Sequence, residues 1–243
     1  MTTRPMLVLL PGLLCDDAVF ADQRVALAAR DVVVADYGGA ATLPAMARGV
    51  LDALPAGRLA VCGHSMGARV ALEMLRVAPQ RIDRLALLDF GVDPCPEGDA
   101  GLAERTQRMA LLELAERDGM QVMGARWAHG MVHPDRLGTP LFERIVAMVA
   151  RKTPALFAAQ IAALLARSAA FDVLAAATCP VLIGCGRQDA WSPLERHRQL
   201  HAQLPGTRLA VFEDAGHMAP MEQPDAVSAA LRDWLDDDGC QRG

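Results

Sequence analysis

Short apolar runs alternate with helical patterns along the first ninety residues of the chain. The apolar runs are typical of buried parallel strands, and they cover residues 6–10, 31–36, 58–62 and 82–89. Between them, apolar residues recur at helical spacing over residues 43–54 and 70–77, and a proline ends the second helix. Strands that alternate with helices indicate βαβ units and a parallel sheet.

The pattern changes after residue 92, where helical periodicity continues without a convincing strand. Four helices are predicted there, at about 101–117, 120–129, 139–151 and 154–167. Strand patterns return at 181–184 and 208–212, and an apolar stripe at 227, 230, 231, 234 and 235 predicts a last helix. Another helix is predicted from Ser192, with Ser192 as cap, Pro193 as first helical residue and Glu195 completing a capping box.

These patterns predict an α/β protein that folds as one unit. The expected core is formed by residues 1–92 and 178–243, with about six mostly parallel strands flanked by helices. Residues 93–177 are expected to form a helical cap inserted in that core. The length of 243 residues and a hydrophobic fraction of 52% supply enough apolar material for a sizeable core.

Charge and composition exclude several classes of function. The net charge is −5 and no run of Lys or Arg stands out, so no nucleic-acid partner is expected. No membrane span and no signal peptide are apparent, so we expect a cytoplasmic protein, monomer or homodimer. The six cysteines are scattered and are interpreted as reduced thiols, and no cluster has metal-ligand spacing: 15, 62, 95, 179, 185 and 240. No metal and no cofactor are predicted.

A candidate nucleophile stands between the third strand and the helix after it. Gly63-His64-Ser65-Met66-Gly67 has the pattern G-x-S-x-G, and its strand–turn–helix context is the one that a nucleophile elbow requires. The turn would expose the Ser65 hydroxyl at the carboxyl edge of the sheet, where sites of α/β proteins lie. Ser65 is therefore the predicted nucleophile.

A serine needs a base, and the base needs a third group to orient it. His217 follows the last predicted strand and Asp189 follows the strand before it, so both are expected at the same edge as Ser65. Asp89, at the end of the fourth strand, is kept as a second candidate for the acid. His64 is interpreted as a packing residue that points away from Ser65.

The expected oxyanion hole consists of two backbone N–H groups, those of Met66 and Leu13. Cys15 lies close to the loop that carries Leu13 and is interpreted as a passive lining thiol. In the predicted cap, Trp127 and His129 are the candidates for contact with substrate, in a mostly apolar cleft. Two other histidines, 197 and 201, share a helical face that is expected to face solvent.

With these motifs the chain resembles the α/β-hydrolase superfamily, closest to its small capped serine hydrolases such as carboxylesterases and enol-lactonases. The elbow, Gly186-x-x-Asp189 with Pro193, and Gly216-His217 with Glu222 and Pro224 carry the resemblance. Pro11 stands where the family usually has a histidine that helps to brace the oxyanion loop. Gly67-Ala68-Arg69 also resembles the lyase of menaquinone synthesis.

The resemblance implies a hydrolase for small carboxylic esters or lactones. Ser65 would form an acyl-enzyme, and the preferred substrates would be apolar acyl esters rather than highly charged ones. A C–C hydrolase or lyase with the same triad, or a ligand receptor that retains a triad, remain alternatives. Rapid turnover of p-nitrophenyl esters would distinguish the hydrolase from the receptor.

Overall fold

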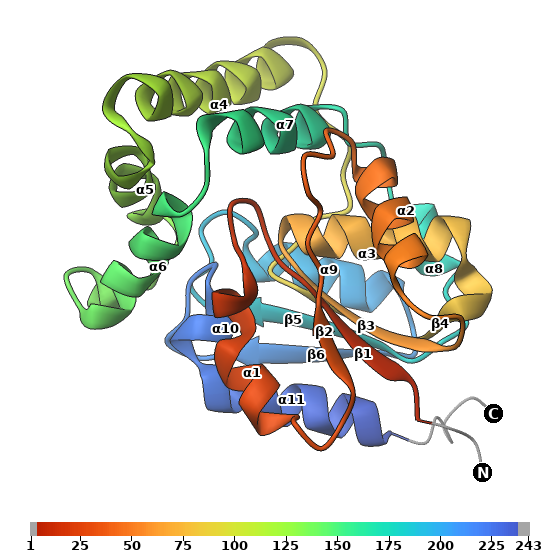
Figure 1. Cartoon of the computed structure of the whole chain (residues 1–243). Coiled ribbons are helices and arrows are strands. Elements are labelled where there is room, and N and C mark those ends of the chain that lie inside the picture. The colour runs from red at the N-terminus through yellow and green to blue at the C-terminus, as the bar shows by residue number, and fades with distance from the viewer. Residues whose placement is uncertain (1–3, 238–243) are drawn as a thin grey trace.

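A single parallel sheet forms the centre of the molecule (Figure 1). The computed structural model describes residues 4–237, and within them six strands are arranged in the order β2-β1-β3-β4-β5-β6. They are β1 (Met6–Leu10), β2 (Val32–Val34), β3 (Leu59–His64), β4 (Ile82–Leu88), β5 (Val181–Gly186) and β6 (Thr207–Phe212). All neighbouring pairs are parallel, with Leu10 of β1 beside Gly63 of β3. The predicted α/β class and the approximate number of strands are confirmed.

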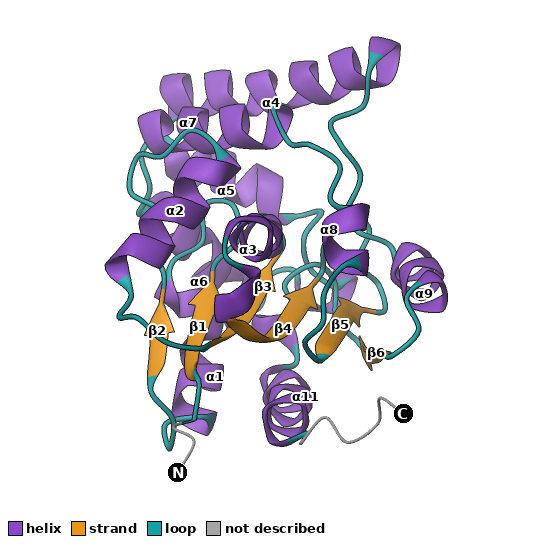
Figure 2. Cartoon of the chain, turned by 90° about the vertical axis from the view of Figure 1, so that its right-hand side faces the viewer, coloured by secondary structure: helices purple, strands orange, loops and turns teal. Residues whose placement is uncertain are grey.

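Helices cover both faces of this sheet (Figure 2). One face carries α2 (Leu43–Ala53), α3 (Met66–Val77), α8 (Phe171–Ala175) and α9 (Leu194–Gln203). The other carries α1 (Ala21–Ala26) and α11 (Pro224–Asp236), with α10 (Ala219–Glu222) next to them. Successive strand residues point to opposite faces, so two apolar layers form, one on each side. Leu7 and Leu9 belong to one layer, and Val8 and Leu10 belong to the other.

Every secondary-structure element between β4 and β5 is a helix. Four of its helices lie above the carboxyl ends of the strands, namely α4 (Gly98–Asp118), α5 (Met120–Ala128), α6 (Pro140–Ala150) and α7 (Pro154–Leu165) (Figure 1). The helix α5 packs on both α4 and α6, and α4 also packs on α7. The short α8 packs instead against α3. We use "upper helices" below for α4 to α7.

Two local predictions need correction. The helix α9 begins at Leu194, with Pro193 as its N-cap and no side-chain cap, so the predicted capping box from Ser192 does not form. The backbone N–H of Ser192 instead donates to the carboxylate of Asp189. Proline fixes its own φ but cannot replace a capping oxygen, and the neighbouring acid competes for the N–H groups of this turn.

The length and apolar character of each helix can be compared with what a membrane span requires. No single helix among residues 4–237 is long and apolar enough to cross a membrane, and only α6 and α7 together, bent by 93° at their break, reach that length and composition. Cys15, Cys62, Cys95 and Cys185 carry free thiols, and Cys240 lies outside the described residues.

Candidate active site

Ser65 occupies a strained turn between β3 and α3. Its φ of 54° and ψ of −115° lie outside the regions that a serine ordinarily adopts. The turn depends on Gly67, because a Cβ there would lie 1.9 Å from the carbonyl oxygen of Leu10. A Cβ on Gly63 would likewise lie 2.4 Å from the Gly67 carbonyl oxygen. The glycines therefore permit the close packing that presents the Ser65 hydroxyl above the sheet.

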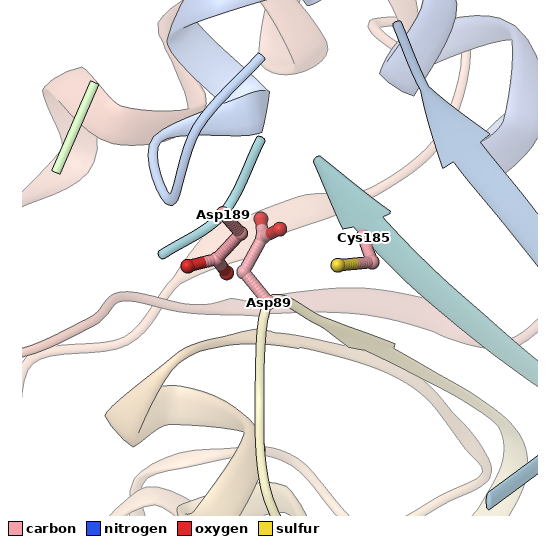
Figure 3. A group of neighbouring side chains, drawn as sticks. All are labelled: Asp89, Cys185 and Asp189. Atoms are coloured by element: carbon pink, nitrogen blue, oxygen red, sulfur yellow. The ribbon is translucent and has the colours of Figure 1, made fainter. Parts of the chain in front are cut away.

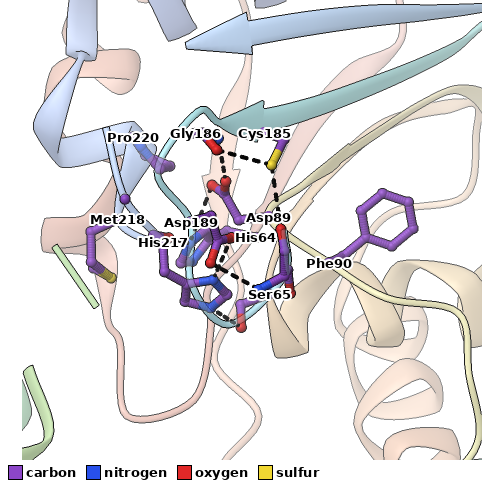
Figure 4. Close-up of polar contacts among 12 residues, drawn as sticks. His64, Ser65, Asp89, Phe90, Cys185, Gly186, Asp189, His217, Met218 and Pro220 are labelled. Carbon is purple, nitrogen blue, oxygen red and sulfur yellow. Dashed lines mark hydrogen bonds and ion pairs between the residues drawn. The ribbon is translucent and has the colours of Figure 1, made fainter. Parts of the chain in front are cut away.

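The three predicted triad residues lie together in the structure (Figure 4). The Nε2 atom of His217 is 2.8 Å from Ser65 Oγ, and its Nδ1 atom is 2.8 Å from Asp189 Oδ2. A carboxylate can only accept, so Nδ1 carries the proton and Nε2 is left to accept from the Ser65 hydroxyl. This arrangement allows His217 to take a proton from Ser65.

Asp189 is buried and remains an acceptor. Burial raises its pKa, but the charge and hydrogen bond of His217 and two backbone N–H groups bring the pKa below its usual range. Those N–H groups belong to Trp191 and Ser192, at 2.8 and 2.9 Å from Asp189 Oδ1. Both oxygens of Asp189 are thus satisfied, which fixes the carboxylate toward His217.

Asp89, the second candidate for the acid, is not placed to orient His217. Its Oδ1 accepts from the backbone N–H of Gly186 at 2.8 Å, and its Oδ2 lies 3.7 Å from His64 Nε2. Burial and the nearby charge of Asp189 hold its pKa well above the usual range, so the group favours the protonated form. The geometry thus favours Asp189 over Asp89.

His64 is buried and supports the loop that carries His217. Burial lowers its pKa to about 3, so the ring is neutral near pH 7. Its Nε2 lies 2.7 Å from the backbone carbonyl oxygen of His217 and therefore donates to it. The two rings lie 5.3 Å apart between centroids. The predicted packing role is extended by this hydrogen bond.

The loop that carries the predicted oxyanion donor of Leu13 is braced by two side chains that lie far away in the sequence. Gln160 of α7 accepts the backbone N–H of Leu14 at 2.8 Å, and the Tyr37 hydroxyl donates to the carbonyl oxygen of Pro11 at 2.9 Å. Neither the Leu13 N–H nor the Met66 N–H has a hydrogen-bond partner within residues 4–237. Both predicted donors are thus unengaged, and Gln160 and Tyr37 stabilise the loop that begins at Pro11.

The loop of His217 is held by Glu222 and by the loop between α5 and α6. The His217 N–H donates to the carbonyl oxygen of Met131 at 2.6 Å. Glu222, which is buried, accepts the N–H groups of Gly216 and Met218 with Oε1 and that of His133 with Oε2. Its pKa is raised by burial despite these three donors. Sequence reasoning singled out Glu222 only through the family resemblance, and its bracing role required the tertiary contacts.

A cavity of about 440 Å³ opens over Ser65 and His217. Its lining includes the apolar side chains of Leu13, Leu111, Trp127, Met131, Leu164 and Trp191, with Cys15 beside them. The pKa of Cys15 is raised to about 12, mainly by burial, so it lines the cavity as a neutral thiol. The volume falls within the range of about 300–1,000 Å³ usual for small-molecule sites.

Trp127 lies in this lining, but His129 does not. The His129 side chain is exposed and its ring packs on Phe142 at 5.7 Å, so the structure places it outside the lining of the cavity. Trp127, two residues before His129, packs on Trp191 at 5.3 Å between ring centroids. On a helix, neighbouring residues point in different directions, and the sequence did not establish which one would face the core.

Trp191 was missed by the sequence analysis. Its ring lies 5.0 Å from that of His217, and it lines the cavity while staying 37% exposed. Its position two residues after Asp189 was the available signal.

The prediction for the two histidines of α9 also needs correction, because His197 is buried and accepts the N–H of Phe90, while His201 is half-buried.

One buried cluster has the composition of a metal site. Asp89, Cys185 and Asp189 place one potential ligand atom each within 4.8 Å of one another (Figure 3). However, burial raises the pKa of Cys185, so a neutral thiol is favoured, and metals bind the thiolate. Asp189 is also fully engaged with His217 and two N–H groups. The cluster is thus better suited to hydrogen bonding than to metal ligation, and the predicted independence from metal stays a prediction.

Comparison with known proteins connects this geometry to a family. The chain matches the α/β hydrolase fold family over residues 28–224. A pimeloyl-[acyl-carrier protein] methyl ester esterase of Aromatoleum aromaticum is 30% identical over 79% of this chain and 79% of its own. RutD of Pseudomonas savastanoi pv. phaseolicola, provisionally named a carbamate hydrolase, is 28% identical over 95% of this chain and 93% of its own.

Among solved structures, a thermophilic esterase from Thermogutta terrifontis superimposes with a TM-score of 0.86. It is 28% identical, and the match covers 96% of this chain and 90% of that one. The matched residues include the Ser65 turn after β3 and most strands of the parallel sheet, so fold and family match point to the same assignment. The chain belongs to the α/β-hydrolase fold family.

Proposed function

We propose that this hydrolase cleaves a small carboxylic ester or lactone with an apolar acyl group, through an acyl-enzyme on Ser65. The observation that carries the proposal is the hydrogen-bonded series from Asp189 through His217 to Ser65 at the floor of the mostly apolar cavity. The relatives support the coarser statement that the protein is an enzyme of the α/β-hydrolase fold that acts on ester bonds.

In the proposed first step, the Ser65 oxygen attacks the carbonyl carbon while its proton passes to His217 Nε2. The N–H groups of Leu13 and Met66 would hold the negative oxygen of the tetrahedral intermediate. Asp189 would stabilise the positive charge on His217. When the intermediate collapses, the carbon–oxygen bond to the alcohol breaks, and the alcohol leaves with the proton from His217.

In the second step, His217 takes a proton from a water molecule that attacks the acyl carbon. The bond to Ser65 breaks, the carboxylic acid leaves, and the proton returns to the Ser65 oxygen. We assign the upper helices, within residues 93–177, the role of a cap that closes the acyl site. Action without metal or cofactor, in the cytoplasm, as a monomer or homodimer, is part of the same proposal.

Replacement of the nucleophile tests the proposal. Ser65→Ala should reduce kcat for p-nitrophenyl butyrate by about 10⁶-fold, because the oxygen that attacks the acyl carbon is removed. A fluorophosphonate should add its mass to Ser65 in the wild type and not in the variant. Ser168→Ala, at an exposed serine outside the cavity, is the matched control and should retain full activity. Retention of a tenth of the activity by Ser65→Ala would refute the assignment.

A further inference from the structure

A buried arginine without a full set of partners lies one helical turn after Ser65. Arg69 of α3 is only 6% exposed, and its Nη1 atom is buried without a hydrogen-bond partner within the described residues. Its Nη2 atom donates to the backbone carbonyl oxygen of Asp93. A buried guanidinium with an unsatisfied N–H group is costly, and natural proteins retain such groups mainly where another partner completes them.

A second cleft, of about 200 Å³, begins at Ser65 and His217 and contains this arginine. Three more arginines line it: 108, 167 and 196. The carboxylate of Glu104, on α4, is hydrogen-bonded to both Arg108 and Arg167. This carboxylate therefore offsets part of the positive charge of that pair.

The other two arginines of the cleft, Arg69 and Arg196, have no ion-pair partner among the described residues. Arg196 of α9 is exposed, and no ion pair engages it in the part of the chain that the structure describes. Arg69 makes no ion pair there either, although the nearby charges of Asp93, Glu73 and Glu104 raise its pKa. Burial and the charge of Arg167 lower the pKa of Arg69 to about 10, which leaves it charged near pH 7.

Acidic groups in the same cleft do not cancel this charge. Asp89 favours its protonated form, as described above, and Asp93 is exposed at the rim. Among the described residues, Asp93 is the only other acid in this lining, which holds four arginines, two of them hydrogen-bonded to Glu104. The cleft therefore retains a positive potential directly beside the nucleophile, and its low-dielectric walls strengthen the attraction for an anion.

The two clefts share Ser65, His217, Arg108, Leu164 and Trp191, so the reacting bond of a substrate would lie where they meet. We propose that the substrate carries a carboxylate group, which Arg69 and Arg196 bind in the second cleft while its apolar part fills the first. This inference rests on the ester hydrolysis proposed above and refines its substrate class. It adds one carboxylate to the apolar ester proposed there, whereas the sequence-based expectation favoured apolar acyl esters over highly charged ones.

A guanidinium suits this task because it offers paired N–H donors to the two oxygens of a carboxylate. The Nη1 of Arg69, in the lining of this cleft, supplies a donor for which residues 4–237 offer no acceptor. Arg196 is exposed, so it would contribute mainly attraction that salt can screen. The carboxylate could belong to the acid part of the ester or to its alcohol part, and the experiment separates these two sources.

The experiment compares matched esters with the full-length protein. In the acid-side pair, monomethyl adipate carries the charge and methyl hexanoate is its neutral counterpart. In the alcohol-side pair, 4-acetoxybenzoate is compared with neutral 4-acetoxybenzamide. We expect kcat/KM to be at least about tenfold higher for the charged member in one of the pairs, and this preference should shrink as salt is added. Equal rates, or faster hydrolysis of the neutral members, in both pairs would overturn the inference.

Variants then assign the preference to the cleft. Arg69→Gln should reduce the ratio of charged to neutral kcat/KM by about 10- to 100-fold, the loss expected for a charged hydrogen bond, and Arg69→Lys should restore part of it. Arg196→Gln, an exposed change that does not depend on core packing, should reduce the ratio about threefold. Arg198→Gln, exposed on the same helix but outside the cleft lining, is the matched control and should leave the ratio unchanged.

The outcomes distinguish this inference from the proposed function. If the four esters are hydrolysed in a Ser65-dependent way but the arginine variants leave the ratio unchanged, the carboxylate site is refuted and the hydrolase stands. If Arg69→Gln fails to fold, the inference is judged on three other results: the charged-to-neutral ratio of the wild type, the fall of that ratio with salt, and the threefold reduction in Arg196→Gln. Absence of these effects would overturn it. If no ester is hydrolysed and no fluorophosphonate labels Ser65, the proposed function fails, and this inference fails with it.

Discussion

The core and the upper helices contribute to the site in different ways. Ser65, Asp189 and His217 each follow the carboxyl end of a strand, β3, β5 and β6, in the parallel sheet. The upper helices supply no member of this hydrogen-bonded series. They supply the carboxamide of Gln160 and part of the walls of the larger cavity, and the loop between α5 and α6 supplies the carbonyl of Met131.

Under the proposed function, this difference separates the reacting groups from the side chains that would select the substrate. Strand ends are rigid, and the close backbone packing around Gly67 and Gly186 leaves little freedom to the loops that carry the reacting groups. A Cβ at Gly186 would lie 2.1 Å from the carbonyl oxygen of Gly216, so the acid loop and the histidine loop touch. The upper helices form side-chain surfaces above this frame, so substitutions there should alter binding and loop position before chemistry.

The largest effect that tests this comparison is expected at the acid. Asp189→Asn should reduce kcat by about 10³- to 10⁴-fold, because the amide favours the wrong tautomer of His217. Asp89→Asn is the matched control. It preserves the acceptor for the Gly186 N–H, and Asp89 makes no hydrogen bond to a side chain of the series, so we expect less than a tenfold loss. Steady-state kinetics on p-nitrophenyl butyrate measures both, and the reverse order would move the acid to the end of β4.

A smaller effect is expected when the upper helices release the oxyanion loop. Gln160→Leu removes the acceptor of the buried Leu14 N–H, so the loop that presents the Leu13 N–H should shift. We expect kcat to fall about 10- to 100-fold with KM changed much less, since the loss is felt in the transition state.

Rescue distinguishes positioning from simple packing at Gln160. Gln160→Glu retains an acceptor of the same shape and should recover most of kcat, whereas exposed Gln203→Leu serves as the control. A fall in thermal stability without a change in kcat for Gln160→Leu would make Gln160 a packing residue.

A change of selectivity, rather than of rate, is expected at Trp127. Trp127→Ala enlarges the apolar cavity next to Trp191, so esters with longer acyl chains should gain on acetyl esters by several-fold. The measurement is kcat/KM across a p-nitrophenyl series from acetate to octanoate, with the melting temperature recorded in parallel. Loss of stability with an unchanged ranking would show that Trp127 only packs against Phe157.

The smallest effect is expected at the thiol in the cavity. The pKa of Cys15 is raised to about 12 by burial, so the thiol stays protonated as pH rises through 8 and 10. Iodoacetamide at pH 8 should therefore leave Cys15 unmodified by mass spectrometry, while the half-buried Cys95 reacts first. Cys15→Ala should change kcat/KM less than threefold, and rapid inactivation that tracks alkylation of Cys15 would contradict its passive role.

Prediction from the sequence succeeded where local pattern and chain order carry the information. The apolar runs identified all six strands of the described sheet, and the strand–turn–helix context located Ser65. Asp189 and His217 followed because parallel strands bring their carboxyl ends to one edge. It failed to place the side chains of His129 and His197, whose exposure depends on which way a helix faces once it is packed.

By itself, then, the sequence determined the fold class, the strand order along the chain and the three residues of the proposed triad, because these depend on periodicity and on glycines at fixed spacing. Only the tertiary structure decided that Gln160 and Tyr37 brace the oxyanion loop, that Trp191 lies against His217, and that Arg69 is buried beside the nucleophile with an unpartnered N–H. The physical reason is that such contacts join residues far apart in the chain, and their side-chain directions follow from how helices pack, which no local pattern encodes.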